Sequence, residues 1–367
     1  MRLALRLARR GFGRTSPNPM VGAVLTKRGQ IIGEGWHCRA GQPHAEIEAL
    51  RDAQAKGHSP RGATLYVTLE PCCTHGRTPP CTGAVIAAGI SRVVVGAIDP
   101  NPAHAGRGLR LLQKTGIRVT QGLLVEEATA LNEAFNHWIV HHTPFVTVKA
   151  AMTLDGKIAT AVGESKWITG EKARAWGRSL RRGADAILVG INTILADDPS
   201  LTARGQRSAA RGQPGRCLRR IILDARARTP LDAQVVSDPA AGLTTVVVGK
   251  SAPANRVADL ARRVTVWQAP ARRGQIDLRW LLNRLGQENV TSLLVEGGGE
   301  VNASFLLGRL AHRIAFCYAP KILGGRDARR AVAGEGARRW EEVLTLRDLQ
   351  WRRLGSDLLL TARVTGA

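Results

Sequence analysis

The chain has 367 residues, of which 44% are hydrophobic, and it carries a formal net charge of +24. This length exceeds the size at which a single hydrophobic core keeps growing, so two domains are expected. No apolar run reaches the ~18 residues that a membrane-spanning helix needs, which argues against an integral membrane protein. Six cysteines in so long a chain do not make a disulfide framework, and a reducing cytoplasm is the expected location.

The positive charge comes mainly from arginine. A charge of this size is compatible with nucleic-acid binding. The arginines are scattered along the sequence, however, and never form a long basic tail. We interpret most of the excess as compositional bias, with a share that serves phosphorylated ligands. No nucleic-acid partner and no membrane partner are therefore expected.

Short strands and helices alternate in the first part of the sequence. The basic segment 1–14 has no uninterrupted apolar core, so we expect an amphipathic helix and not a targeting peptide. The Pro-rich turn at 15–19 follows, and its Asn18 is a candidate substrate-binding residue because it presents a side-chain amide. Strands are predicted at 20–25, 30–34, 66–69, 92–95 and 117–119, with a hairpin turn at Arg28 and Gly29. Helices are predicted at 43–56, 82–88, 109–114 and 124–141.

One of these strands leads into the sequence EPCCTHGRTPPC, which is read together with PHAE upstream. His44, Cys72 and Cys81 supply one imidazole and two thiolates, a ligand set for zinc with the fourth position open to water. Glu46 lies two residues after the histidine and is placed to move protons to and from that water. His-x-Glu followed by Pro-Cys and a further Cys is the signature of zinc-dependent nucleobase deaminases.

The third zinc ligand is not settled by spacing alone. Eight residues separate Cys72 from Cys81, where the compact motif has two. Cys73 and His75 lie between them, and Cys72-x2-His75 also has a spacing that suits zinc.

The alternating pattern restarts near residue 145, after a boundary at 142–144. Strands are predicted at 145–151, 186–190, 220–223, 244–248, 264–268, 292–296, 351–354 and 358–364. Helices are predicted at 170–182, 255–263, 278–286 and 301–307, the first with Thr169 as its N-cap. The stretch 204–216 is rich in Gly, Arg, Ser and Pro and is predicted to be a surface loop.

Two motifs in this second part are candidates for ligand binding. Gly297, Gly298 and Gly299 join a strand to a helix, where backbone N–H groups can approach a phosphate. They do not form the G-x-G-x-x-G fingerprint, so a standard dinucleotide fold is not implied. Asp197 and Asp198 form a second polar cluster, which is either turn chemistry or a site for a hydroxylated ligand.

Two other interpretations remain open at this point. A nucleic-acid deaminase would account for the zinc motif and the charge, but it does not need a second domain with a phosphate-binding turn. A non-enzymatic zinc scaffold would need four protein ligands, so Cys73 or His75 would have to complete the zinc shell.

The chain resembles the bifunctional riboflavin-biosynthesis deaminase-reductases over nearly its full length. The resemblance rests on TSPNP (15–19), GEGWH (33–37), AGQPHAE (40–46), TLEPCCTHGRTPPC (68–81), KAAMTLDGKIA (149–159), SKWITG (165–170), DAILVG (185–190), ADDPSLTAR (196–204), VEGGG (295–299) and APKILGG (319–325). It implies a cytidine-deaminase-like three-layer α/β/α domain at 1–143 and a dihydrofolate-reductase-like α/β domain at 144–367. A homo-oligomer in the cytoplasm is expected.

The resemblance also implies two successive reactions with Zn²⁺ and NADPH as cofactors. The first would hydrolyse the 2-amino group of 2,5-diamino-6-(5-phospho-ribosylamino)pyrimidin-4-one. The second would use NADPH to reduce the ribosyl arm of 5-amino-6-(5-phosphoribosylamino)uracil to ribityl. The substrate is thus a phosphorylated pyrimidine, and two arginines can grip its phosphate in bidentate fashion.

The family's functional positions can be carried over residue by residue. Its zinc ligands fall on His44, Cys72 and Cys81, with Glu46 as the proton carrier. Its NADPH contacts fall on Ala151, Trp167, Thr193, Asp197, Gly298, Gly299, Glu300, Val301, Asn302, Ala303 and Ser304. Its substrate contacts fall on Ser165, Arg181, Leu201, Arg204 and Glu296. Lys149 is a candidate for orienting the opening ribose or donating a proton. Ala225 replaces a serine that is expected near the cofactor.

Overall fold

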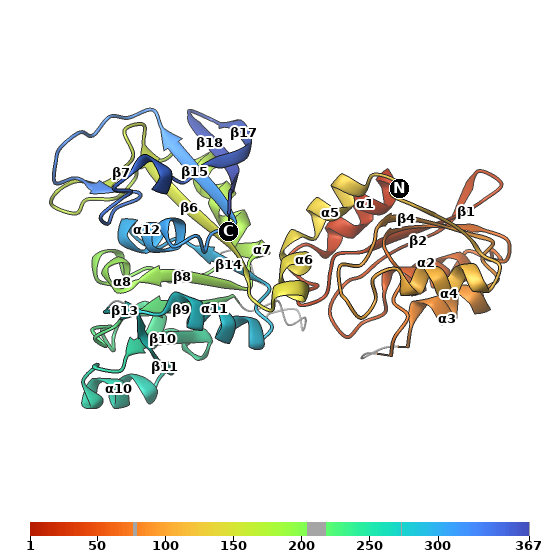
Figure 1. The fold of residues 1–367 in the computed structure, drawn as a ribbon, viewed down its shortest axis with the longest axis horizontal. Coiled ribbons are helices and arrows are strands. Elements are labelled where there is room, and N and C mark those ends of the chain that lie inside the picture. The colour runs from red at the N-terminus through yellow and green to blue at the C-terminus, as the bar shows by residue number, and fades with distance from the viewer. Residues whose placement is uncertain (76–78, 204–217, 273, 367) are drawn as a thin grey trace. The chain divides into compact units, whose positions relative to one another are not determined.

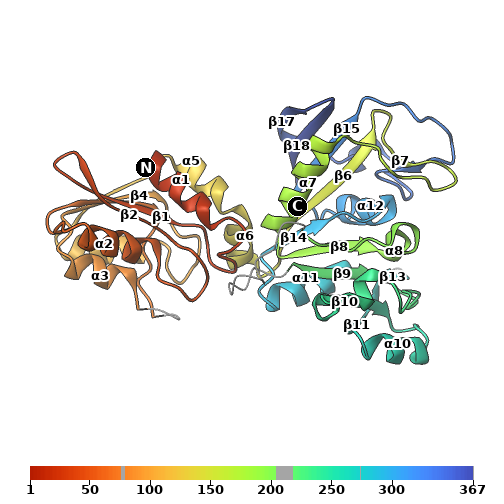
Figure 2. The same cartoon turned by 180° about the vertical axis from the view of Figure 1, so that it is seen from behind.

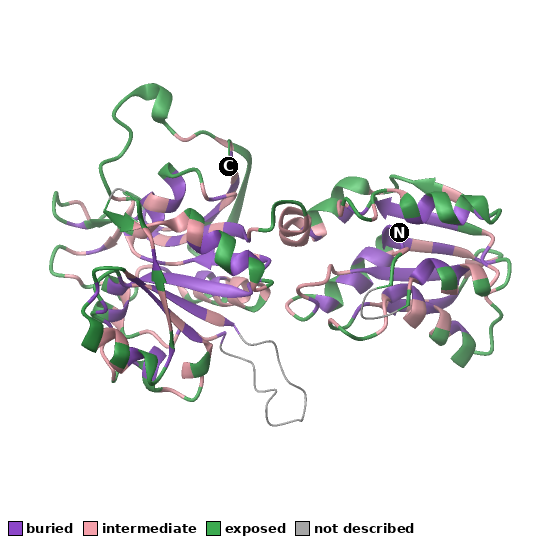
Figure 3. Cartoon of the chain, turned by 60° about the horizontal axis from the view of Figure 1, so that its bottom comes forward, coloured by how far each residue is buried: buried purple, intermediate pink, exposed green. Residues whose placement is uncertain are grey.

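The computed structural model describes residues 1–75, 79–203, 218–272 and 274–366, and the predicted loop at 204–216 lies outside them. The chain forms two compact units, Met1–His142 and Thr143–Ala367 (Figure 1). In both, the buried residues lie mainly along the strands, and exposed residues occupy loops and the outer faces of helices (Figure 3).

The first unit is built on a five-stranded sheet with the order β2-β1-β3-β4-β5. Its strands are β1 (Gly22–Lys27), β2 (Gln30–Trp36), β3 (Thr64–Leu69), β4 (Arg92–Ala97) and β5 (Arg118–Gln121). β1 is antiparallel to β2 and β3, whereas β3, β4 and β5 are parallel. The predicted hairpin is confirmed, since Arg28 and Gly29 both have positive φ (50° and 79°), as a tight hairpin turn requires.

Helices cover both faces of this sheet, as Figures 1 and 2 show. α1 (Arg2–Ala8) and α5 (Val125–Leu131) lie on one face, and α2 (Ala45–Ala55), α3 (Cys81–Ala87) and α4 (Arg107–Lys114) lie on the other. Successive side chains of a strand point to opposite faces of the sheet. Leu25 and Val67 therefore belong to the core under α2 to α4, whereas Val24 packs with Leu7 of α1. The expected three-layer α/β/α architecture is confirmed.

The single helix predicted at 124–141 is wrong, because the helix breaks at Asn132 into α5 and α6 (Glu133–His141). The Asn132 side chain accepts a hydrogen bond from Met20 N (2.8 Å) and donates one to Met20 O (2.9 Å). Its amide therefore pairs with the chain before β1, while its backbone leaves the helical region (φ −118°, ψ 24°). Helical periodicity carries no signal of such a distant contact.

Helix α2 approaches β2 closely because Gly33 and Gly35 lack side chains. A Cβ atom on Gly35 would lie 2.3 Å from both Ala45 O and Ala49 N. These are backbone atoms of the first two turns of α2, the turns that follow directly on the candidate zinc ligand His44. The spacing between sheet and helix therefore depends on a missing methyl group.

Replacing Gly35 by alanine is expected to destabilise the first unit by about 1–3 kcal/mol, since a methyl group inserted into a packed core forces a backbone shift. The shift would displace the start of α2, so zinc affinity should fall as well. Thermal unfolding and titration with a competing zinc chelator would measure both effects. Gly83→Ala is the matched control, because a Cβ atom there meets nothing within 4 Å. Equal zinc affinity in both variants would contradict this expectation.

The second unit is built on a nine-stranded sheet with the order β11-β10-β9-β8-β14-β6-β15-β18-β17. Neighbouring strands from β11 to β15 are parallel, and β18 and β17 extend the sheet antiparallel. The strands are β6 (Phe145–Thr153), β8 (Ala186–Gly190), β9 (Arg219–Leu223), β10 (Thr244–Gly249), β11 (Thr265–Ala269), β14 (Ser292–Val295), β15 (Arg313–Ala319), β17 (Leu346–Leu354) and β18 (Asp357–Val364).

The helices of this unit are α7 (Glu171–Gly183), α8 (Ile191–Asp197), α9 (Gln234–Ser237), α10 (Ala254–Ala261), α11 (Leu278–Gln287) and α12 (Gly299–Leu307). Short pairs form between β7 (Lys157–Ala159) and β16 (Arg329–Arg330), and between β12 (Ala271–Arg272) and β13 (Gln275–Ile276). Short 3-10 turns occur at η1 (Arg9–Gly11), η3 (Ala241–Leu243) and η4 (Trp340–Glu342). In the described part of the chain, no helix combines the length and apolarity needed to cross a membrane.

The N-cap predicted for α7 is wrong. Gly170, not Thr169, occupies that position, and no side chain caps the helix. The Gly170 N–H donates instead to Oδ2 of Asp357, 2.7 Å away at the start of β18. A partner from the far end of the chain thus replaces the local cap that the sequence suggested.

Candidate active sites

Three side chains of the first unit converge on one point. His44 occupies the N-cap position of α2, Cys72 follows β3, and Cys81 is the first residue of α3. His44 Nδ1 lies 3.5 Å from Cys72 Sγ and 3.3 Å from Cys81 Sγ, and the three ligand atoms all lie within 4.8 Å of one another. Ligands of a tetrahedral zinc ion with bonds of about 2.1 and 2.3 Å lie roughly 3.6 Å apart. The cluster therefore fits zinc, with one position left for water.

The charge state of this cluster also suits a cation. Hydrogen bonding from Cys81 outweighs burial and lowers the pKa of the Cys72 thiol to about 4. The thiolate is the form of cysteine that binds metals. The same contact with Cys72 raises the pKa of the Cys81 thiol.

The two rival ligands lie outside this cluster. Among the described residues, the candidate metal group contains neither Cys73 nor His75. Cys73 Sγ lies 3.7 Å from Nδ1 of His104, which belongs to the segment between β4 and α4. His75 is exposed. The geometry thus groups Cys81, and not its rivals, with His44 and Cys72.

Glu46 lies in the first turn of α2 and is only 3% exposed. Its side chain lines a cavity of about 350 Å³ together with His44 and Cys72. Burial raises the pKa of the Glu46 carboxyl to about 7, in the range that suits a group which takes and returns a proton near neutral pH. Asn18, the candidate from the N-terminal turn, lines the same cavity.

Several residues of this cavity were not singled out from the sequence. His37 holds Asn18, whose Nδ2 lies 3.1 Å from His37 Nε2, while His37 Nδ1 lies 3.0 Å from Pro43 O. Asp99 and Asn101 also line the cavity. Only GEGWH, which ends at His37, gave a sequence signal for any of them.

The loop that carries Asp99 and Asn101 is held by one buried carboxylate. Glu70 is 4% exposed and accepts backbone N–H bonds from Asp99, Gly106, Gly108 and Leu109 at 2.9 to 3.4 Å. The carboxylate between β3 and the Pro-Cys motif therefore fixes one wall of the cavity. Its position directly before the metal motif was a signal that sequence reasoning did not use.

The second unit brings together three charged residues that the sequence placed far apart. Arg181 of α7 forms a bidentate pair with Glu296, with Nε to Oε1 at 3.0 Å and Nη2 to Oε2 at 2.7 Å. Lys149 of β6 lies 3.8 Å from the same carboxylate. Burial alone would raise the pKa of Glu296, but the charges of Lys149 and Arg181 outweigh it and hold this pKa at about 2. The Glu296 carboxylate therefore stays ionised at neutral pH beside its two cationic neighbours.

A cavity of about 720 Å³ lies where α8 and α12 begin. Gly298 is the N-cap residue of α12, and its N–H donates to Thr193 Oγ1 at 3.2 Å. Ser165 Oγ donates to Asp197 Oδ1 at 2.9 Å across the same cavity. The predicted site residues that line it are Ser165, Thr193, Asp197, Gly298, Gly299, Glu300 and Val301. The N-terminus of α12 lies at this cavity, and the backbone N–H groups of a helix N-terminus suit the phosphates of a dinucleotide.

Other predicted contacts lie elsewhere. Asn302 and Ala303 are buried, and Asn302 Nδ2 donates to Ala331 O. Ser304 lines an adjoining cavity of about 390 Å³, together with Ala225. Ala151, Trp167 and Leu201 are not among the described residues that line either cavity. Arg204 lies outside the described residues.

Family models match both units. The model described as "RibD C-terminal domain" matches residues 144–360, and the model described as "Cytidine and deoxycytidylate deaminase zinc-binding region" matches residues 1–97. The riboflavin biosynthesis protein RibD of Actinobacillus pleuropneumoniae is 43% identical over 361 residues, which cover 98% of this chain and 93% of that protein. The Escherichia coli protein of the same name is 40% identical over 366 residues, covering 98% and 97%.

The chain belongs to the RibD family. Solved RibD structures agree along nearly the whole chain. RibD of Acinetobacter baumannii (form 1) superposes with a TM-score of 0.84 at 38% identity, covering 99% of this chain and 97% of that one. A Thermotoga maritima structure described as a diaminohydroxyphosphoribosylaminopyrimidine deaminase/5-amino-6-(5-phosphoribosylamino)uracil reductase has a TM-score of 0.82 at 35% identity, covering 99% and 97%.

Membership of the RibD family confirms several expectations together. The protein is a bifunctional enzyme of riboflavin biosynthesis, with a zinc-dependent deaminase domain followed by an NADPH-dependent reductase domain. The expected pairing of a cytidine-deaminase-like fold with a dihydrofolate-reductase-like α/β fold is confirmed as well. The zinc scaffold without catalysis is thereby set aside.

Proposed function

We propose that residues 1–143 deaminate 2,5-diamino-6-(5-phospho-ribosylamino)pyrimidin-4-one. Residues 144–367 then reduce the ribosyl arm of the resulting 5-amino-6-(5-phosphoribosylamino)uracil with NADPH. The observation that carries this assignment is the convergence of His44, Cys72 and Cys81 on one point, where His44 and Cys72 line one cavity together with Glu46. The substrate identity is supported by the description of the Thermotoga maritima structure.

In the deaminase unit, His44, Cys72 and Cys81 would hold the zinc ion. A zinc ion bound there supplies a water molecule whose pKa is lowered from 15.7 toward ~7. Glu46 would accept a proton at its carboxyl and return it to the departing ammonia, because this carboxyl lines the same cavity. Asn18 binds the pyrimidine through its side-chain amide, which His37 holds in place.

In the reductase unit, NADPH supplies the hydride when bound. Thr193, Asp197 and the backbone at 298–301 line the cavity that would hold it, and the N-terminus of α12 faces phosphate charge favourably. The family pattern extends these contacts to Ala151, Trp167 and 302–304.

The charged cluster would bind the other reactant. Arg181 and Ser165 hold the phosphorylated ribosyl arm, with Glu296 keeping the Arg181 guanidinium oriented. Lys149 orients the opening ribose or donates a proton to it, since its Nζ lies in this cluster. Leu201 and Arg204 complete the substrate contacts in the family pattern.

We also infer a cytoplasmic homo-oligomer. The cysteines of the described residues are free thiols, which is compatible with a reducing compartment. Strand β17 lies at the edge of the sheet that the described residues form, and its Leu349 and Trp351 are more than half exposed. Exposed apolar side chains on an edge strand favour pairing with another chain. Sedimentation of the purified protein would test the oligomer.

A coupled assay with a matched pair of cysteine variants tests the proposed function. The wild-type protein should release ammonia from the diaminopyrimidinone and then oxidise NADPH. Cys81→Ser should lose bound zinc and at least about 10²-fold in ammonia release, whereas Cys73→Ser should keep both. Zinc content and ammonia are measured together. Zinc retention with no ammonia release by the wild-type protein would reject the deaminase, and ammonia release without NADPH oxidation would reject the reductase.

A further inference from the structure

The parallel strands of the second unit contain a charged side chain that is almost fully buried. Arg220 of β9 is 1% exposed. A guanidinium has five N–H donors, and here each has an acceptor. The acceptors are Thr244 Oγ1 (2.8 Å), Asp238 Oδ1 (2.8 Å), Asp238 Oδ2 (2.7 Å), Val235 O (3.2 Å) and Ser200 O (3.1 Å).

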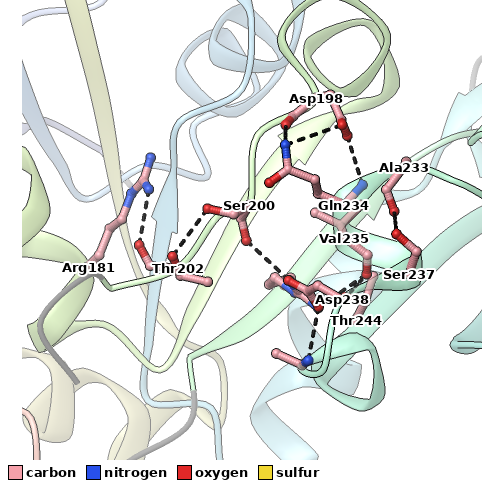
Figure 4. A network of polar contacts seen from close by, with 12 residues as sticks. Arg181, Asp198, Ser200, Thr202, Ala233, Gln234, Val235, Ser237, Asp238 and Thr244 are labelled. Carbon is pink, nitrogen blue, oxygen red and sulfur yellow. Dashed lines mark hydrogen bonds and ion pairs between the residues drawn. The ribbon is translucent and has the colours of Figure 1, made fainter. Parts of the chain in front are cut away.

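Four of these five contacts go to α9 and the segments around it, but the fifth reaches another part of the chain. Ser200 belongs to the segment 198–202 that follows α8, and Arg220 Nη1 donates to its backbone oxygen. A second residue, Gln234, forms hydrogen bonds with the same segment. Gln234 of α9 donates from its backbone N to Asp198 Oδ1 (2.9 Å) and from Nε2 to Asp198 O (2.6 Å) (Figure 4).

The segment 198–202 contains two residues with an unfavourable backbone conformation. Asp198 and Leu201 have positive φ values of 37° and 48°, although neither is glycine. Residues other than glycine persist in the left-handed region only where the surroundings fix them. The contacts from Arg220 and Gln234 lie at and between these two positions, which explains how the segment keeps its shape.

The same segment touches the candidate substrate site. Thr202 O accepts a hydrogen bond from Arg181 Nη1 at 3.3 Å, and Thr202 Oγ1 lies 3.2 Å from Ser200 Oγ (Figure 4). Arg181 also donates hydrogen bonds from Nε and Nη2 to the Glu296 carboxylate. A continuous series of contacts therefore runs from the buried Arg220 through 200–202 to the guanidinium that would bind substrate.

We propose that Arg220, Asp238 and Gln234, here called the clamp residues, position the reductase substrate site by fixing 198–202 against Arg181. They are positioning residues, since none of them is among the described residues that line the two cavities beside α12. The proposal rests on the proposed role of Arg181 in substrate binding. Loosening the clamp should change substrate binding more than cofactor binding, because Thr202 touches Arg181, whereas none of the residues 198–202 lines the NADPH cavity.

The double variant Arg220→Met/Asp238→Leu removes the clamp without leaving a lone buried charge, which single replacements would do. Gln234→Ala is a milder second variant on an exposed residue. Arg219→Met/Glu288→Leu is the matched control, since it replaces the ion pair of the adjacent β9 residue (2.7 Å) and does not touch 198–202. All are made in the full-length protein, and thermal unfolding checks the fold.

The rate of the reductase step is measured with the deaminated substrate supplied directly. The dissociation constant of this substrate is measured separately by calorimetry in the absence of NADPH. The double variant should raise the KM and Kd for substrate about tenfold, and Gln234→Ala about threefold, with the NADPH values within about twofold of wild type. The control should change neither. Unchanged substrate binding in both clamp variants, or an equal loss of substrate and NADPH binding, would overturn the proposal. If the wild-type protein itself binds no substrate, the proposed function fails and the substrate role of the clamp fails with it.

Discussion

Replacing Glu46 by glutamine is expected to lower the rate of ammonia release about 10³-fold. Glutamine has nearly the same volume, so the packing of α2 is preserved, but its amide can neither take the proton of the attacking water nor return it. The Glu46 residue is only 3% exposed, so a carboxylate ion from the buffer has little access to take its place. Ammonia release under saturating diaminopyrimidinone is the measurement.

Two controls accompany this variant. Zinc content should match that of the wild-type protein, because the candidate metal group contains His44, Cys72 and Cys81 without Glu46. NADPH oxidation should stay within about twofold of wild type when the deaminated substrate is supplied, since the second unit is unchanged. Ammonia release at the wild-type rate, with zinc in place, would assign proton transfer to another group.

Replacing Glu296 by glutamine is expected to destabilise the second unit by about 3 kcal/mol. The neutral amide leaves Arg181 and Lys149 as neighbouring positive charges in a site where the carboxylate is only 9% exposed. Reduction of the deaminated substrate should fall in parallel, because the orientation of Arg181 depends on its two bonds to this carboxylate. Urea unfolding followed by tryptophan fluorescence is suitable, since most of the eight tryptophans belong to this unit.

The pH dependence of this effect has a definite sign. The pKa of Glu296 is lowered from 4.5 to about 2 in the folded protein, so its charge stabilises the fold fully above pH 4.5. This contribution is lost as the pH falls from 4.5 toward 2. The difference in unfolding free energy between wild type and Glu296→Gln should therefore shrink over that window. A difference that is constant with pH would show that the carboxylate is not stabilised by its two cationic neighbours.

Sequence patterns predicted the elements that are strongly periodic or bounded by glycine and proline. The hairpin at Arg28 and Gly29 is an example, because two left-handed residues suffice to fix a tight turn. The buried run at 186–190 became β8 with the predicted limits. The zinc ligands could also be predicted from local sequence, because the His-x-Glu and Pro-Cys motifs are short. The structure brings His44, Cys72 and Cys81 together.

Features that depend on distant partners could not be predicted. The break at Asn132 depends on Met20, and the start of α7 depends on Asp357. β15 (Arg313–Ala319) and α8 (Ile191–Asp197) were not predicted, although both border the reductase site or its sheet. Arg220 looked like one more arginine in a basic chain, and only its five buried contacts distinguish it.

The strand order of the second unit has a consequence for protein synthesis. β6, its first strand, pairs on one side with β14 and on the other with β15, both of which leave the ribosome late. The nascent second unit therefore exposes an unpaired apolar strand for most of its translation, whereas the strands of the first unit all lie within 22–121 and can pair early. Pairings of such long sequence separation form slowly. A messenger truncated before β15 would yield an intact deaminase unit attached to an aggregation-prone sheet with an open edge at β6.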